Sequence, residues 1–159
     1  MDAVWTSLIA VAGTIAGTNL GAWWNARNAR AERTDRRRGE QRDQLLTALA
    51  GLVAALADHR RAMWVLGETR LTDGTEQAVA AAMATTHETR SAISAPLTRV
   101  RILGPGLAEQ ATKATQATYA LRDAPDCDEL RRRRQASVDA VAELEAAAGQ
   151  LWQHPSSAG

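Results

Sequence analysis

The sequence has no phenylalanine, one tyrosine and one cysteine among its 159 residues. Strands prefer aromatic and β-branched side chains, whereas Ala, Leu and Arg, which are abundant here, favour helices. With Cys127 alone, the chain can form neither an internal disulfide nor a cluster of thiolate metal ligands. Its length leaves room for one modest core. The sequence therefore predicts an all-α protein with a single packed domain.

Charged side chains are missing from residues 3–24, a run of 22 positions. A helix of that length can cross a bilayer core of about 30 Å. Trp5 lies near one end, and Trp23 and Trp24 lie at the other, as expected of side chains at the two membrane interfaces. A cleaved signal peptide is not expected, because Asp2 precedes the apolar stretch and the arginines follow it. We predict a transmembrane anchor over residues 1–24, with a buried or interfacial helix as the alternative.

The net charge is only +1, but arginines gather over residues 27–42 and again over residues 131–134. Positive residues beside a membrane span favour the cytoplasm, so the sequence predicts a single-pass protein of the cell membrane with a cytoplasmic C-terminal domain. Residues 25–44 are charged on every side and are expected to form a helical stalk whose arginines contact lipid headgroups. The arginines expected to set the topology are Arg27, Arg30, Arg33, Arg36, Arg37 and Arg38.

Glycine recurs every four residues along the predicted anchor, which places small side chains on one face of the helix. Membrane helices associate through such faces, because close van der Waals packing replaces the missing hydrophobic drive. The larger side chains, such as Leu8 and Ile15, lie on the other face. We therefore predict self-association into a homo-oligomer through a face made of Ala10, Gly13, Thr14, Gly17, Thr18 and Gly21.

Residues 45–153 show the apolar spacing of helices that pack on one another. The first helix follows a 4-3 alternation typical of coiled-coil seams and should end near Gly67. Asp73 and Glu76 have the spacing of a capping box for the second helix, in which Pro96 should introduce a kink. The two predicted seams are Leu45, Leu49, Leu52, Leu56, His59, Met63 and Leu66, and then Val79, Met83, Thr86, Arg90, Ile93, Leu97 and Val100.

Two further helices complete the predicted domain. Gly104 should end the second helix, and Pro105 suits the first position of a third that runs to Leu121. Asp126 and Glu129 repeat the capping-box spacing ahead of a fourth helix. Short connections make sequential helices antiparallel neighbours, which predicts an up-down bundle of about four helices followed by a flexible tail over residues 154–159. The fourth helix should bury Val138, Val141, Leu144, Ala148 and Leu151.

Three polar residues fall at the mid-height of the predicted seam between the first two helices: His59, His87 and Arg90. Antiparallel pairing brings them level, where a buried polar layer can fix the register of the helices. The alternatives are exposure of one or both histidines to solvent and a metal site, although two histidines without further His, Cys or carboxylate ligands fall short of a metal site. We expect a polar core layer and no bound metal.

The sequence contains no motif that points to catalysis. It has no phosphate-binding loop, dinucleotide fingerprint, nucleophile elbow or zinc spacing. The run Arg131–Arg134 splays around its helix beside acidic residues, which favours a solvated face. Nucleic acid is not an expected partner, because mixed charge without interleaved aromatic residues is a poor surface for a phosphate backbone. We expect a protein that is not an enzyme and has no cofactor.

The segments that follow one another along the chain are Gly13–Gly17 in the anchor, the Arg-rich stalk, Ala57–Trp64 in the first bundle helix, and Thr89–Ile93 with Ala95–Leu97 in the second. In this order they resemble the KilB-type plasmid spread proteins of Streptomyces. The resemblance covers most of the chain. It implies a membrane protein of a conjugative plasmid or integrated element that takes part in spreading the plasmid through the recipient mycelium, in company with other transfer or spread proteins.

Three hypotheses about function follow. The first is a membrane-anchored, self-associating structural protein of plasmid spread, and it joins the resemblance to the small-faced anchor. The second is a membrane-active toxin or pore former, in which the glycine face tightens an oligomer; it predicts that expression alone dissipates the membrane potential. The third is a membrane-tethered nucleic-acid binder, which would have to retain DNA at physiological salt.

Overall fold

The computed structural model describes the backbone of residues 2–72 and 74–153 and the side chains from residue 36 onward within those ranges. Two units can be distinguished, Met1–Arg42 and Asp43–Gly159. Throughout the described ranges the chain is helical or in turns, without a strand. The all-α prediction is therefore confirmed. The four α-helices are α1 (Asp2–Leu71), α2 (Glu76–Leu103), α3 (Ala108–Tyr119) and α4 (Cys127–Gln153).

The first unit is the N-terminal part of α1, and the second unit contains the rest of α1 with α2, α3 and α4. Among residues whose side chains are described, no helix is long and apolar enough to span a bilayer. The predicted anchor, its small face, the three tryptophans and the arginines at 27, 30 and 33 lie outside those residues. Arg36, Arg37 and Arg38 lie within them and are exposed on α1.

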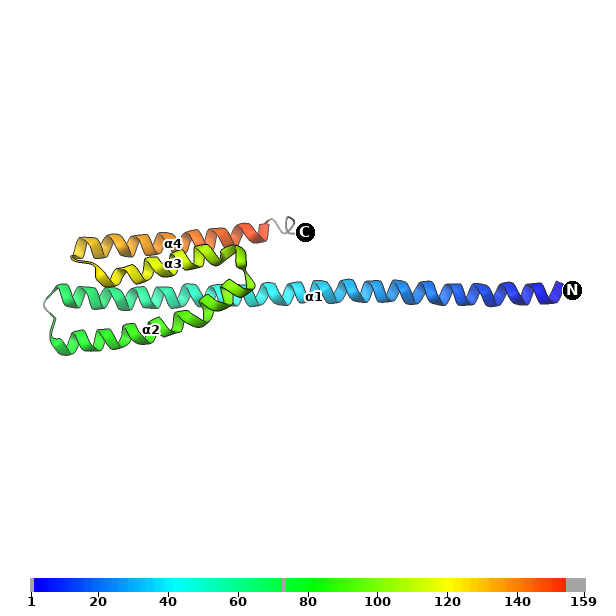
Figure 1. Ribbon diagram of the computed structural model, residues 1–159, viewed down its shortest axis with the longest axis horizontal. Helices are drawn as coiled ribbons and strands as arrows, with labels where there is room; N and C mark the ends of the chain where they lie inside the picture. Colours follow the sequence, from blue (N-terminus) through cyan, green and yellow to red (C-terminus); the bar gives the residue numbers. More distant parts are fainter. Residues whose placement is uncertain (1, 73, 154–159) are drawn as a thin grey trace. The chain divides into compact units, whose positions relative to one another are not determined.

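The second unit is a bundle in which successive helices run in opposite directions. In Figure 1 the chain runs to the left along the bundle part of α1, back to the right along α2, to the left along α3 and back along α4. Two 3₁₀ turns join these helices, Pro105–Leu107 before α3 and Ala120–Asp123 after it. The up-down arrangement predicted from the short connections is the one observed.

The core is built on the leucine seam of α1. Six of its seven predicted members are buried, and Leu52 and Leu56 have no exposed surface. Full burial of a leucine contributes roughly 1.5–3 kcal/mol, so this seam supplies much of the bundle's stability. Around it pack Ile93 and Val100 of α2, Ala111 and Ala114 of α3, and Leu144 of α4.

The seam of α2 differs from the prediction in its first half. Thr86, Ile93 and Val100 are buried as expected, but Met83 is 37% exposed and Arg90 is exposed. Ala82 is buried in place of Met83, and Thr89 contacts α1 in place of Arg90. The predicted set of core positions and the observed set have Thr86, Ile93 and Val100 in common. The helix turns the small residues inward because a guanidinium is costly to bury without a partner.

The ends of α2 show which capping signals operate. Its N-cap is Thr75, whose hydroxyl accepts a hydrogen bond from the Ala78 amide at 3.3 Å, so the predicted role of Asp73, itself outside the described residues, is wrong. Gly104 ends the helix as predicted, with its amide donating to the Val100 carbonyl at 2.9 Å. The helix passes through Pro96, and Figure 1 shows it curving along its length.

In α4 the predicted start is confirmed and the predicted seam is partly wrong. The Asp126 carboxylate accepts a hydrogen bond from the Glu129 amide at 2.7 Å, as an N-cap does. Val141, Leu144 and Ala148 are buried, but Val138 and Leu151 are 37% and 45% exposed. Ser137 and Leu130 occupy the core instead. The Ser137 hydroxyl can lie in the core because it has a hydrogen-bond partner on α3, which is described below.

Candidate functional site

The polar layer predicted on α1 centres on His59, which is 3% exposed. Its Nδ1 lies 2.9 Å from the hydroxyl oxygen of Thr89 on α2. That hydroxyl lies 2.9 Å from the Thr85 carbonyl, its own acceptor, so the imidazole Nδ1–H can donate to it. The ring of Tyr119 from α3 stands edge-on to the imidazole, with ring centres 5.4 Å apart and planes at 86°. Three helices thus meet at His59.

The surroundings of His59 keep its ring neutral. Burial of the ring, with the nearby positive charges of Arg90 and Arg122, lowers its pKa from 6.5 to about 4. The Arg90 guanidinium lies over the Tyr119 ring, 4.9 Å from its centre. His59 therefore acts at neutral pH as a hydrogen-bonding group inside the bundle rather than as an acid or base.

The three residues predicted for this layer have different positions. His59 lies inside the bundle, and Arg90 lies at its edge over Tyr119. His87 is exposed, so its predicted place in the core is wrong. One residue along a helix is a rotation of about 100°, and because Thr86 faces inward, His87 turns away. Thr89 and Tyr119, which the sequence did not single out, complete the layer.

A second buried polar contact joins α3 to α4. Thr118 and Ser137 have no exposed surface, and their hydroxyl oxygens are 2.8 Å apart. Thr118 also donates to the Ala114 carbonyl at 2.9 Å, which leaves its oxygen to accept from Ser137. The sequence analysis missed this pair. The seven-residue spacing of Leu130, Ser137 and Leu144 was the signal that could have found it.

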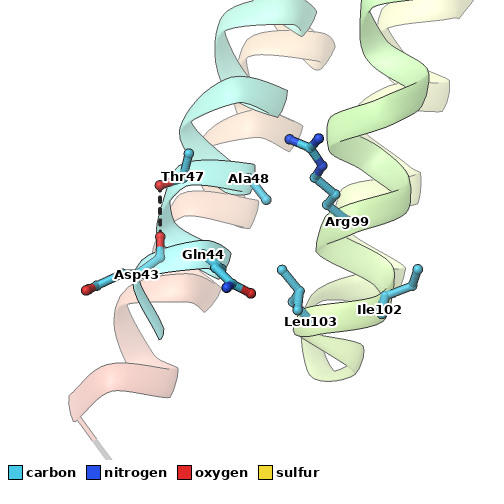
Figure 2. Close-up of a pocket in the computed structure, with 7 residues that line it drawn as sticks. All are labelled: Asp43, Gln44, Thr47, Ala48, Arg99, Ile102 and Leu103. Atoms are coloured by element: carbon cyan, nitrogen blue, oxygen red, sulfur yellow. Dashed lines mark hydrogen bonds between the residues drawn. The ribbon is translucent and has the colours of Figure 1, made fainter. Parts of the chain in front are cut away.

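The bundle also has a pocket of about 470 Å³ between α1 and α2, near residue 43. Figure 2 shows Asp43, Gln44 and Thr47 on the α1 side. From α2, Arg99 and Leu103 point across the gap, whereas Ile102 points away from it and is 73% exposed. Within the described part of the chain, no three His, Cys, Asp or Glu side chains are grouped so as to hold a metal ion.

The comparison with protein families matches most of the bundle, and the comparison with individual proteins extends beyond it. Residues 46–152 match the family described as KilB plasmid transfer protein. The chain belongs to the KilB family of plasmid transfer proteins. Protein KilB of Streptomyces lividans is 50% identical over 147 residues, which cover 92% of this chain and 97% of that relative. The resemblance noted from the sequence is thereby confirmed. The comparison with solved structures found no match to this chain.

Proposed function

We propose that the chain is a membrane-anchored, self-associating structural protein that helps a conjugative plasmid spread within recipient mycelium, and that it acts without catalysing a reaction. The observation that carries this proposal is its relation to Protein KilB, which extends over 92% of the chain. That share includes much of the N-terminal segment as well as the bundle. A protein of this kind works by assembling with other copies or other proteins rather than by chemistry at a site of its own.

The uncharged run of residues 3–24 supports the anchor, and the arginines behind it support a bundle on the cytoplasmic side of the cell membrane. Among the described residues, α1 contributes to the bundle core from residue 45 onward. The glycine spacing supports self-association.

The proposal is tested by deleting the gene from its plasmid. We expect the zone of transfer around single donor colonies on a recipient lawn to shrink severely, while transconjugant counts from short matings change little. Restoring the gene in the recipient should restore the zone. An unchanged zone would contradict the proposal. An equal loss of first transfer would assign the protein to DNA translocation instead.

Replacing Gly17 by leucine should weaken self-association, because a bulky side chain on the small face keeps two backbones apart. The measurement is the yield of cross-linked dimer from membranes that carry either form. Ala12→Leu is the matched control, since Ala12 lies about 140° around the helix from Gly17, on the face of the larger side chains. Equal dimer yields from wild type and Gly17→Leu would show that the helices associate elsewhere.

A further inference from the structure

Arg60 on α1 has a buried donor without an acceptor among the described residues. Its side chain is half-buried, and Nη1 is shielded from solvent with no hydrogen-bond partner in that part of the chain. A guanidinium keeps its charge and offers five N–H donors, so leaving one of them unused inside a protein is unfavourable. Such a nitrogen indicates either a strained position or a place for an acceptor that the chain itself does not supply.

A second arginine lies at the same edge of the bundle. The Arg134 guanidinium of α4 lies over the ring of Trp64, with its carbon 5.1 Å from the ring centre. Trp64 follows Arg60 by one turn of α1, so the two share a face of that helix. The pKa of the Arg60 guanidinium is lowered mainly by burial and to a smaller extent by the positive charge of Arg134. Two positive groups therefore lie near Trp64, one on α1 and one on α4.

The three arginines that precede Arg134 on α4 all form ion pairs with carboxylates. Arg131 pairs with Asp128 at 2.6 Å, and Arg132 and Arg133 both pair with Glu129 at 2.6 Å. Arg60 and Arg134 form no ion pair with any carboxylate in the part of the chain whose side chains are described. Like charges held together destabilise the bundle until an anion lies between them.

We propose that Arg60 and Arg134, with Trp64 beneath Arg134, form a binding site for a phosphate group at the α1–α4 edge. Two guanidinium groups supply two positive charges and several directed donors. A phosphate monoester carries nearly two negative charges and three acceptor oxygens, which matches this set better than a carboxylate with one charge. The phosphate can belong to a soluble ester or to the headgroup of phosphatidic acid. This site goes beyond the proposed role in plasmid spread and does not depend on it.

The test is the thermal unfolding of the full-length protein in a neutral detergent, with sodium chloride or sodium phosphate at equal ionic strength. Phosphate should raise the unfolding midpoint of the wild type, because a ligand that binds only the folded state stabilises it. Arg134→Gln should lower the apparent affinity for phosphate at least about tenfold, the usual effect of losing a charged hydrogen bond. In chloride the same variant should unfold no earlier than the wild type, since a like charge has been removed.

Arg131→Gln is the matched control, because Arg131 is exposed and paired with Asp128. It should keep the full response to phosphate. Arg134→Lys retains the positive charge but lacks the planar set of guanidinium donors, so phosphate should raise its unfolding midpoint only weakly. The same rise in wild type and Arg134→Gln would reduce the effect to general screening and overturn the proposal, as would the absence of any rise specific to phosphate.

The source of the phosphate is found by repeating the measurement in phosphatidylcholine vesicles with and without phosphatidic acid. A rise caused by phosphatidic acid and lost in Arg134→Gln assigns the site to lipid headgroups. A rise caused only by added inorganic phosphate assigns it to a soluble ester. No rise in either arm would contradict the site, whether or not the protein proves to act in plasmid spread.

Discussion

A plasmid that encodes the protein without residues 3–24 should spread no farther than one that lacks the whole gene. The truncated protein keeps every residue of the leucine seam, so its bundle should still fold. It should move from the membrane fraction to the soluble fraction, because the uncharged run has been removed. Assembly at a membrane depends on local concentration, which this loss reduces by orders of magnitude. The readouts are the transfer-zone diameter and the distribution of the protein after fractionation.

A chimera separates anchoring from self-association. Replacing residues 3–24 by an unrelated single-spanning helix without a small face should return the protein to the membrane. If the zone is restored, anchoring alone is what spread requires. If the zone stays small, the glycine face has a role of its own. Normal spread by the truncated protein would show that residues 3–24 do not serve as its anchor.

Acidification should weaken the bundle through His59. Its pKa is about 4 in the folded protein and 6.5 when unfolded, so the unfolded state binds more protons between these values. The free energy of unfolding should therefore fall as the pH drops from about 6.5 to about 4, by about 1–3 kcal/mol. The measurement is urea unfolding of the full-length protein at intervals across this range.

Two variants isolate this contribution. His59→Gln removes the titrating group and keeps an amide that can reach the Thr89 hydroxyl, so its stability should vary less with pH. His87→Gln is the matched control, because His87 is exposed and should leave the wild-type curve unchanged. Glu129, whose pKa is lowered by hydrogen bonds from Arg133 and Arg132, adds the same loss at acidic pH to all three proteins. Parallel curves for wild type and His59→Gln would contradict the assignment.

The sequence predicted the parts of the bundle where large apolar residues decide the contact. The α1 seam is an example, since leucine stands at most of its positions and no neighbouring set competes. The α2 seam was ambiguous because the apolar spacing allows either Met83 and Arg90 or Ala82 and Thr89 to face the bundle. Small and polar residues signal burial weakly, so only their neighbours in space reveal their role.

The candidate sites were predictable to a smaller extent for the same reason. The position of His59 within the leucine seam indicated that it is buried, but its partners lie on two other helices. The approach of Arg134 to Trp64 depends on how α4 is rotated against α1, and a seam wrongly centred on Val138 does not give that rotation. Side-chain pairs between distant segments require the packed structure.

The hydroxyl pair of Thr118 and Ser137 restricts how α3 and α4 can slide past each other. If α4 moved by one heptad along α3, Leu130 or Leu144 would face Thr118, and Ser137 would face apolar side chains. Each such misalignment leaves a buried hydroxyl without its hydrogen-bond partner, which costs about 1–3 kcal/mol. The pair contributes little net stability when correctly made. The pair therefore favours one alignment of the alanine-rich surfaces of α3 and α4 over the alignments that are shifted along the helices.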